Sequence, residues 1–238
     1  MKKIPTLFKR VFDENHKKSI TDEVTEGCQW VLGNWEKHDA SEIATVKYDG
    51  ACCAIIDGEI YKRYDAKQKY AKTPPEGAIP CQPEPDPITG HWPHWVKCEE
   101  GKPEDKYFID AFRRSKTYVF SAIRIVQHSR GEADSTGVAY SCEAIGPHWQ
   151  NNPHELYEDQ LILHGMNVIP WKKLSGDDGN VTLESIRQYL SWMPKVRLPG
   201  GWRNWPIEGI VFWKGGQPCC KIKRSDFGFE WPIKGDLK

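Results

Sequence analysis

Four short segments of this sequence combine lysines and carboxylates in a way that suits chemistry on phosphate groups. They are Lys47-Tyr48-Asp49-Gly50, Glu143-Ala144-Ile145-Gly146, Glu208-Gly209-Ile210-Val211-Phe212 and Lys221-Ile222-Lys223-Arg224. A lysine amine is a nucleophile only when neutral, and neighbouring cations or partial desolvation must lower its pKa from the usual value of about 10.4. Each segment alone fits an ordinary hairpin turn, edge strand or solvated strand. The chemistry therefore depends on the four segments taken together.

The elements that carry these segments are expected to be mostly strands. Residues 43–64 predict three short strands in a meander, joined at Asp49-Gly50 and Asp57-Gly58, because Asp-Gly tolerates the positive φ angles of tight hairpin turns. The segment Gly209–Ile222 predicts two further strands with a turn at Lys214–Gln217. Three of the four segments therefore begin or end next to an expected strand.

Helices are expected in two places. The sequence predicts a helix that begins near Tyr107, followed by a strand over Thr117–Val126. Leu183–Met193 has helical spacing of its apolar residues, with Thr182 as the N-cap and Pro194 as the stop. Helices and antiparallel strands together indicate an α+β protein.

The composition is that of a folded chain without a membrane span. The 238 residues include 39% hydrophobic residues and 11 Trp, enough to bury a core. Apolar runs such as Ala51–Ile56 and Ile207–Trp213 are far shorter than the roughly 20 residues that cross a bilayer. The first residues lack the apolar stretch of a secretory signal, so we expect a cytoplasmic protein. The Pro-rich residues 73–103 are expected to form a long loop or an ordered lid.

The cysteines are expected to be reduced. Cys52-Cys53 and Cys219-Cys220 are adjacent pairs inside expected strands, where neighbouring side chains point to opposite faces. No C-x-x-C occurs, and Cys81, Cys98 and His91 do not follow a zinc-finger pattern. We therefore expect no structural zinc.

Net charge gives no argument for a nucleic-acid partner, since 33 Lys and Arg balance 33 Asp and Glu. The distribution is uneven, however, because Glu208 is the only acidic residue between Ser185 and Arg224, a stretch rich in lysine and arginine. A basic stretch of this kind is either a solvated face or a phosphate-binding surface.

Taken in order, the four segments resemble nucleotidyl transferase motifs I, III, IV and V of the covalent lysyl-nucleotide superfamily, which comprises ATP-dependent ligases and capping enzymes. Arg63 stands where that superfamily places an arginine after its first motif. Leu161-Ile162-Leu163-His164-Gly165 occupies the position of motif IIIa, which stacks a side chain on the nucleobase.

Local details are similar to the small ATP-dependent 5′-to-3′ RNA ligase family that includes the vertebrate enzyme. The matching segments span residues 43–233 and are Asp49–Cys53, Gly90–Val96, Glu143–Gly146 with Asn152-Pro153, Leu163–Gly165 and Phe227–Ile233. The resemblance implies an α+β fold with a nucleotidyltransferase (ATP-grasp-like) core, in which two mostly antiparallel sheets flank an ATP cleft and helices lie outside.

The resemblance also implies a role for each catalytic residue. Lys47 would attack the α-phosphorus of ATP and carry AMP, which passes to a 5′-phosphate before a 3′-hydroxyl displaces it. Lys221 and Lys223 would clamp the α-phosphate, because alternation puts both on one strand face with Ile222 on the other. Glu208 would hold Mg²⁺, with Mn²⁺ as a substitute.

The remaining ATP-binding residues would be Asp49, Arg63, Glu143 and His164. Glu143 would accept a hydrogen bond from a ribose hydroxyl or help to hold the metal. Arg63 would use its planar donor fork on the ribose or on a polynucleotide phosphate, and His164 would contact the adenine.

The implied partner is RNA with 5′-phosphate and 3′-hydroxyl ends, bound by a monomer that acts in RNA repair. Tryptophans interleave with basic residues, as base stacking and phosphate binding require, and about two of them are assigned to RNA. The set is Trp92, Trp95, Trp149, Trp202, Trp205 and Trp213. The segment Pro199–Trp205 is the best candidate.

Three alternatives stay open. The stretch beyond Arg224 is too short for an OB-fold domain, so we expect one nucleotidyltransferase domain over residues 1–238. This favours a minimal RNA ligase over a DNA nick ligase and over a GTP-using capping guanylyltransferase. The third alternative is a non-catalytic module that binds RNA or a nucleotide, but binding alone does not need the nucleophile Lys47.

Overall fold

The computed structural model describes residues 4–14, 18–67, 73–87, 89–130, 136–192, 195–198 and 201–233. Side chains are described for the same residues except 18, 128–130, 195–198, 202 and 203. The chain divides into two compact units, and each is described by itself. Unit 1 comprises residues 49–164, and unit 2 comprises residues 4–48 and 165–233. Both units are built on antiparallel sheets, which confirms the α+β class.

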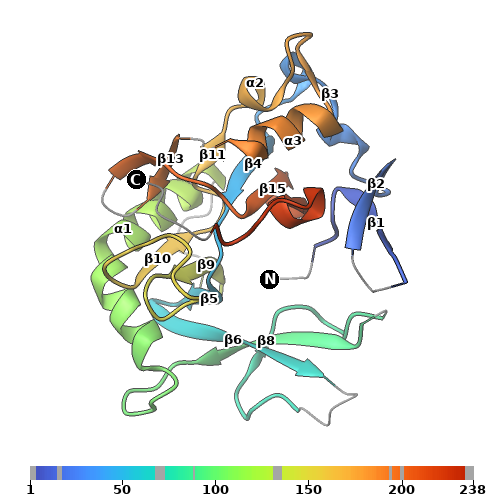
Figure 1. Ribbon diagram of the computed structural model, residues 1–238. Helices are drawn as coiled ribbons and strands as arrows, with labels where there is room; N and C mark the ends of the chain where they lie inside the picture. Colours follow the sequence, from blue (N-terminus) through green and yellow to red (C-terminus); the bar gives the residue numbers. More distant parts are fainter. Residues whose placement is uncertain are drawn as a thin grey trace. The chain divides into compact units, whose positions relative to one another are not determined.

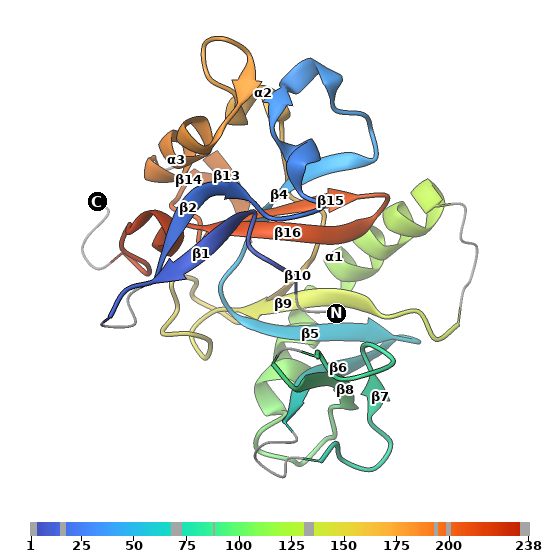
Figure 2. The same cartoon turned by 90° about the vertical axis from the view of Figure 1, so that its right-hand side faces the viewer.

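Unit 1 is a six-stranded antiparallel sheet with one long helix against it (Figures 1 and 2). The strand order is β10-β9-β5-β6-β8-β7, and helix α1 (Lys106–Arg130) packs against β10, β9 and β6. The strands are β5 (Ala51–Ile56), β6 (Glu59–Lys67), β7 (Ile79–Pro80), β8 (His91–Lys97), β9 (Tyr140–Ile145) and β10 (Gln160–Leu163). One sheet face has an apolar centre, with Cys53, Ile55, Cys142 and Leu161 at most 1% exposed.

The strand expected over Thr117–Val126 is wrong, because these residues continue helix α1. Their β-branched side chains suggested a strand, but the buried residues of the whole helix recur at helical spacing. They are Phe108, Ile109, Ala111, Ser115, Val119, Ala122 and Ile123. Packing of this stripe outweighs the weak local preference for a strand. No helix in the described part of the chain is both long and apolar enough to cross a membrane.

The Pro-rich segment 73–103 is not only a loop, since it contains β7 and β8. Strand β8 pairs with β6 along its whole length, from His91 opposite Lys67 to Lys97 opposite Tyr61. Trp95 is 3% exposed and fixes the strand in the core. Proline lowers the strand propensity of a segment, but this pairing and burial outweigh it.

Unit 2 is built on a four-stranded antiparallel sheet in the order β11-β4-β15-β16. These strands are β4 (Glu42–Lys47), β11 (Val168–Ile169), β15 (Gly209–Lys214) and β16 (Gln217–Lys223). Three two-stranded ribbons add β1 (Phe8–Phe12) with β2 (Lys18–Val24), β3 (Gly33–Asn34) with β12 (Asn180–Val181), and β13 (Lys195–Leu198) with β14 (Gly201–Asn204). The helices are α2 (Trp171–Leu174), α3 (Leu183–Ser191) and the 3₁₀ turns η1 (Gln29–Val31), η2 (Trp35–Lys37) and η4 (Arg224–Phe227).

Of the two expected Asp-Gly turns, only one is a hairpin. Asp57-Gly58 joins β5 to β6 with φ angles of +49° and +80°, as predicted. Asp49-Gly50 is not a hairpin, because β4 and β5 belong to different sheets, so the expected meander is wrong. Gly50 is needed for another reason: a Cβ there would lie 2.1 Å from the carbonyl oxygen of Ala144. The glycine lets two backbones approach each other.

Two further expectations are confirmed in unit 2. Strands β15 and β16 form a hairpin around the predicted turn. Helix α3 begins after Thr182, whose Oγ1 accepts a hydrogen bond from the Ser185 N–H at 3.1 Å, while Ser185 Oγ accepts one from the Thr182 N–H at 2.8 Å. This reciprocal pair is a capping box. The predicted stop at Pro194 lies outside the described residues.

Thr182→Ala removes this cap and should lower the free energy of unfolding by about 1 kcal/mol. The loss is measured by urea denaturation, with Thr73→Ala, at an exposed loop position, as the matched control. Equal midpoints for the two variants would contradict the assignment of the cap.

Candidate functional site

Three strands of unit 2 bring Lys47 and Lys223 into one row. Gly209 of β15 lies directly opposite Lys47 of β4 on one side and Lys223 of β16 on the other. Residues opposite each other in an antiparallel sheet share a face, so both lysine side chains project from the same face of the sheet. A Cβ on Gly209 would lie 2.1 Å from the carbonyl oxygen of Ile222. Only glycine therefore fits between the two lysines.

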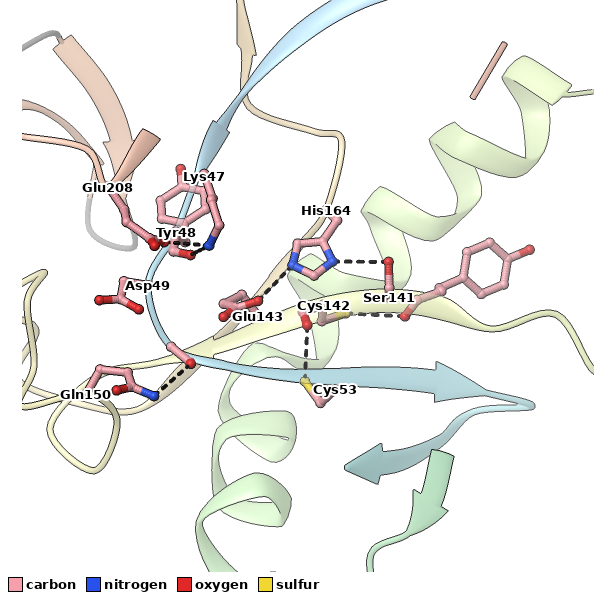
Figure 3. Close-up of polar contacts among 12 residues, drawn as sticks. Lys47, Tyr48, Asp49, Cys53, Ser141, Cys142, Glu143, Gln150, His164 and Glu208 are labelled. Carbon is pink, nitrogen blue, oxygen red and sulfur yellow. Dashed lines mark hydrogen bonds and ion pairs between the residues drawn. The ribbon is translucent and has the colours of Figure 1, made fainter. Parts of the chain in front are cut away.

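A single buried carboxylate holds both lysines of this row. Glu208 is 3% exposed, and its Oε2 lies 2.5 Å from Lys47 Nζ (Figure 3). Its other oxygen, Oε1, pairs with Lys223 Nζ. Lys47 Nζ also donates to the carbonyl oxygen of Tyr48 at 3.3 Å. The ammonium of Lys47 is thus held at a fixed position at the end of β4.

Lys221 lies on the same face as Lys223, while Ile222 between them is fully buried on the other face. The alternation predicted from the sequence is therefore confirmed. No hydrogen bond or ion pair of the Lys221 side chain is found within the described residues. Burial, followed by the positive charges of Lys47, Lys223 and Arg10, lowers the pKa of Lys221 from 10.5 to about 8.

Arg10 and Asp226 belong to the same cluster, and the sequence reasoning missed both. Arg10 Nε and Nη2 donate to Asp226 Oδ1 at 3.1 and 2.7 Å. Asp226 Oδ2 accepts the backbone N–H of Lys223 at 2.8 Å, and its side chain is fully buried. No spacing rule links residue 10 to residue 226, so only the fold reveals this pair.

The donor set in unit 2 fits a divalent cation only if that cation brings ligands of its own. No group of three or more His, Cys, Asp or Glu side chains that could hold a metal occurs in the described ranges. Mg²⁺ is usually bound through one or two carboxylates together with substrate phosphates, and Glu208 offers such a carboxylate. Because both of its oxygens contact lysines, an ion there would compete with Lys47 and Lys223.

In unit 1, Glu143, Cys52 and Arg63 form a second row across β9, β5 and β6. Glu143 pairs directly with Cys52, and the register of β5 with β6 places Cys52 opposite Arg63. Arg63 Nε donates to Asp65 Oδ1 at 2.9 Å. Burial, with the charge of Glu143 second, raises the pKa of the Cys52 thiol to about 12, so this cysteine is unreactive at neutral pH.

His164 connects two side chains of β9 through both ring nitrogens (Figure 3). Its Nε2 lies 3.0 Å from Glu143 Oε2, and its Nδ1 lies 3.1 Å from Ser141 Oγ. A carboxylate only accepts, so we infer that Nε2 carries the proton and donates to Glu143. In the neutral ring the Ser141 hydroxyl then donates to Nδ1. His164 therefore orients the Glu143 carboxylate.

The predicted site residues fall into two groups. Lys47, Glu208, Lys221 and Lys223 come together in unit 2, whereas Asp49, Arg63, Glu143 and His164 belong to unit 1. The backbone N–H of Asp49 donates to His154 Nε2 at 3.1 Å. All eight cysteines are free thiols, as expected.

The tryptophans assigned to RNA are mostly structural where they are described. Trp95, Trp205 and Trp213 are at most 8% exposed, which makes them core residues and not stacking platforms. Trp213 Nε1 donates to Thr45 Oγ1 at 2.8 Å. In the segment Pro199–Trp205, residues 199 and 200 and the side chains of residues 202 and 203 lie outside the described ones.

No protein-family model matches this chain, and a search of curated proteins finds no similar sequence. The functional interpretation therefore rests on the residues and their geometry.

Lys221→Met should stabilise the protein at neutral pH, because it removes a buried charge that the fold does not compensate. Below about pH 8 the lysine is protonated in both the folded and the unfolded state. The folded state is then destabilised by the full cost of burying this charge beside other cations. Between about 8 and 10.5 the folded state alone loses the proton, and the penalty fades as pH rises. Calorimetry at pH 7 should give a Tm about 2–4 °C higher than that of the parent protein.

The gain should shrink as the pH approaches 10. Lys173→Met, at an exposed position of α2, is the control and should leave Tm unchanged. A lower Tm for Lys221→Met at pH 7 would contradict the electrostatic argument.

Proposed function

We propose that this protein is an ATP-dependent RNA ligase on a nucleotidyltransferase core, which joins 5′-phosphate and 3′-hydroxyl ends through an adenylylated Lys47. One observation supports the proposal above all others. Lys47 and the pair Lys221 and Lys223 come from distant parts of the sequence, yet they lie on one face of a sheet, where the buried Glu208 carboxylate pairs with Lys47 and Lys223. This is the set of residues that covalent lysine chemistry on a phosphate requires.

The reaction begins with the amine of Lys47. Nζ of the neutral amine forms a bond to the α-phosphorus of ATP and releases one proton to solvent, while the bond from that phosphorus to the bridging oxygen of the β-phosphate breaks and pyrophosphate leaves. In the protein without nucleotide, the Glu208 carboxylate 2.5 Å away favours the charged form of Lys47. Once Glu208 is engaged by other partners, the charges of Lys221 and Lys223 favour the neutral, nucleophilic form.

Lys221 and Lys223 take up the negative charge of the reacting phosphate. The two lysines are alternate residues of β16 and project from the same face of the sheet, so both ammonium groups can contact the same phosphate. A phosphate bound to Lys221 supplies the negative charge that this ammonium lacks and offsets the burial that disfavours its charged form. Mg²⁺ bound with the nucleotide at Glu208 would add further neutralisation of phosphate charge.

In unit 1, Glu143 is the candidate for the ribose hydroxyl and Arg63 for a phosphate or ribose oxygen. The carboxylate of Glu143 is held by His164 and keeps further acceptor capacity for a hydroxyl. We propose that His164 acts by positioning Glu143, since both of its ring nitrogens are used in hydrogen bonds. Its role would then be orientation of a carboxylate.

Lys47→Arg should abolish covalent labelling, because a guanidinium stays protonated and cannot act as the nucleophile. The test incubates the protein with Mg²⁺ and ATP labelled at the α-phosphate, and mass spectrometry checks for one added AMP on Lys47. Lys173→Arg, at an exposed position, should label like the parent protein. Labelling from GTP alone, no label on the parent protein, or label retained in Lys47→Arg would overturn the proposal.

Sealing assays with matched RNA and DNA ends separate an RNA ligase from a DNA nick ligase. We expect joining of RNA ends that carry a 5′-phosphate and a 3′-hydroxyl. Joining of nicked DNA alone would favour the rival, and labelling without any joining would favour a different acceptor of AMP.

His164→Phe should slow adenylylation more than His164→Gln. Glutamine keeps an N–H donor for Glu143, whereas phenylalanine keeps only a ring that could stack on a base. The loss in Phe is expected to be about tenfold in the single-turnover rate, the usual cost of a hydrogen bond to a charged group. The opposite order, with Phe active and Gln slow, would assign His164 to base stacking instead.

A further inference from the structure

The lysine cluster of unit 2 holds more positive than negative charge. Its cations are Lys47, Lys221, Lys223 and Arg10, and its carboxylates are Glu208 and Asp226. Glu208 forms ion pairs with Lys47 and Lys223, and Asp226 forms one with Arg10. Lys221 forms no ion pair with a carboxylate in the described part of the chain. A half-buried excess of positive charge is a site for an anion.

Arg10 is fixed in this cluster by a buried anchor. Its Nε and Nη2 both donate to Asp226 Oδ1, and the Asp226 side chain is fully buried. The Arg10 side chain is 28% exposed, so the guanidinium still reaches solvent. A guanidinium has five N–H donors, and about three remain for a ligand after the bonds to Asp226. Such a fork, already held in place, suits the oxygens of a phosphate.

The path of the chain explains why Arg10 lies beside the end of β16. The Leu7 N–H donates to the carbonyl oxygen of Lys221 at 2.7 Å, and the Lys221 N–H donates to the carbonyl oxygen of Pro5 at 3.0 Å. This bridge is parallel, so the residues that follow Thr6 run in the same direction as those that follow Lys221. Arg10 thereby reaches Asp226 in η4, four to five residues further along both segments.

We propose that Arg10, next to Lys221, forms a subsite for a phosphate group other than the one that Lys47 attacks. The inference rests on the proposed function for its place in the reaction, but the anion site itself follows from the charges and contacts of Arg10, Lys221 and Asp226. Two sources supply the same chemistry: the pyrophosphate half of ATP and the terminal 5′-phosphate of an RNA strand. We expect the pyrophosphate half, because Lys221 and Lys223 share the α-phosphate in the proposed reaction.

Binding of inorganic pyrophosphate tests the subsite without any reaction. Calorimetric titration in the presence of a chelator compares the parent protein with Arg10→Ala, Arg10→Lys and Lys9→Ala. We expect affinity to fall about tenfold in Arg10→Ala and by less in Arg10→Lys, which keeps the charge and the pairing with Asp226 but loses the fork. Lys9→Ala removes an exposed cation of the same strand, paired with Glu23, and should bind like the parent protein.

Equal pyrophosphate affinity in the parent protein and in a folded Arg10→Lys variant would overturn the proposal. A thermal melt of each variant establishes folding, and Arg10→Lys keeps the test valid if Arg10→Ala unfolds. The pyrophosphate titration does not require adenylylation of Lys47. Its result would therefore stand even if the protein proved not to be a ligase.

Separate assays of the reaction steps distinguish the two sources of phosphate. If the pyrophosphate half binds at Arg10, the variants slow the labelling of Lys47 by ATP, while transfer of AMP from labelled protein to 5′-phosphorylated RNA keeps its rate. If the terminal 5′-phosphate binds there, transfer slows and labelling is unchanged. Parent-like rates in both steps would contradict a subsite for either group.

Discussion

The buried carboxylate of Glu208 is the constraint on which the rest of unit 2 depends. Removing a carboxylate from water costs several kcal/mol, which only close and well-placed cations offset. The partners of Glu208 are Lys47 and Lys223, one on each side of Gly209. A one-residue slip of β4 or β16 would turn its lysine to the opposite face of the sheet. The ion pairs of Glu208 therefore form only in this register of the three strands, so the same pairing fixes both the sheet and the site.

The opposite face of this sheet compensates for the unfavourable charges. Ile210, Phe212 and Ile222 are fully buried there, and Ile222 lies directly between Lys221 and Lys223 in the sequence. On the site face, burial and like charges already lower the pKa of Lys221, so the protein maintains a cation at a position that would be more stable without one. Such local destabilisation is common at functional sites, where it is tolerated because the surrounding core is strong.

Sequence patterns predicted what depends on local chemistry. Thr182 and the Asp57-Gly58 turn were correctly placed because capping and hairpin geometry involve only neighbouring residues. The alternation of Lys221 and Lys223 was also correct, since it follows from strand geometry. Asp49-Gly50 was wrongly assigned to a hairpin because its glycine serves a contact with β9, which lies about ninety residues away in the chain. The Arg10–Asp226 pair joins residues 216 positions apart, and no local signal encodes it.

Sharing one carboxylate between two lysines also couples their chemistry. Any ligand that draws Glu208 away releases Lys47 and Lys223 together, and both then lie beside Lys221 without their compensating charge. The phosphate of the same ligand can compensate the charges of Lys221 and Lys223. For Lys47, loss of the proton is the way to remove the repulsion from these two neighbouring charges. In the reaction that we propose, this arrangement would restrain Lys47 until a phosphate arrives and would favour its nucleophilic form only then. A lysine placed in the same cluster with a carboxylate of its own would lack this dependence on the ligand.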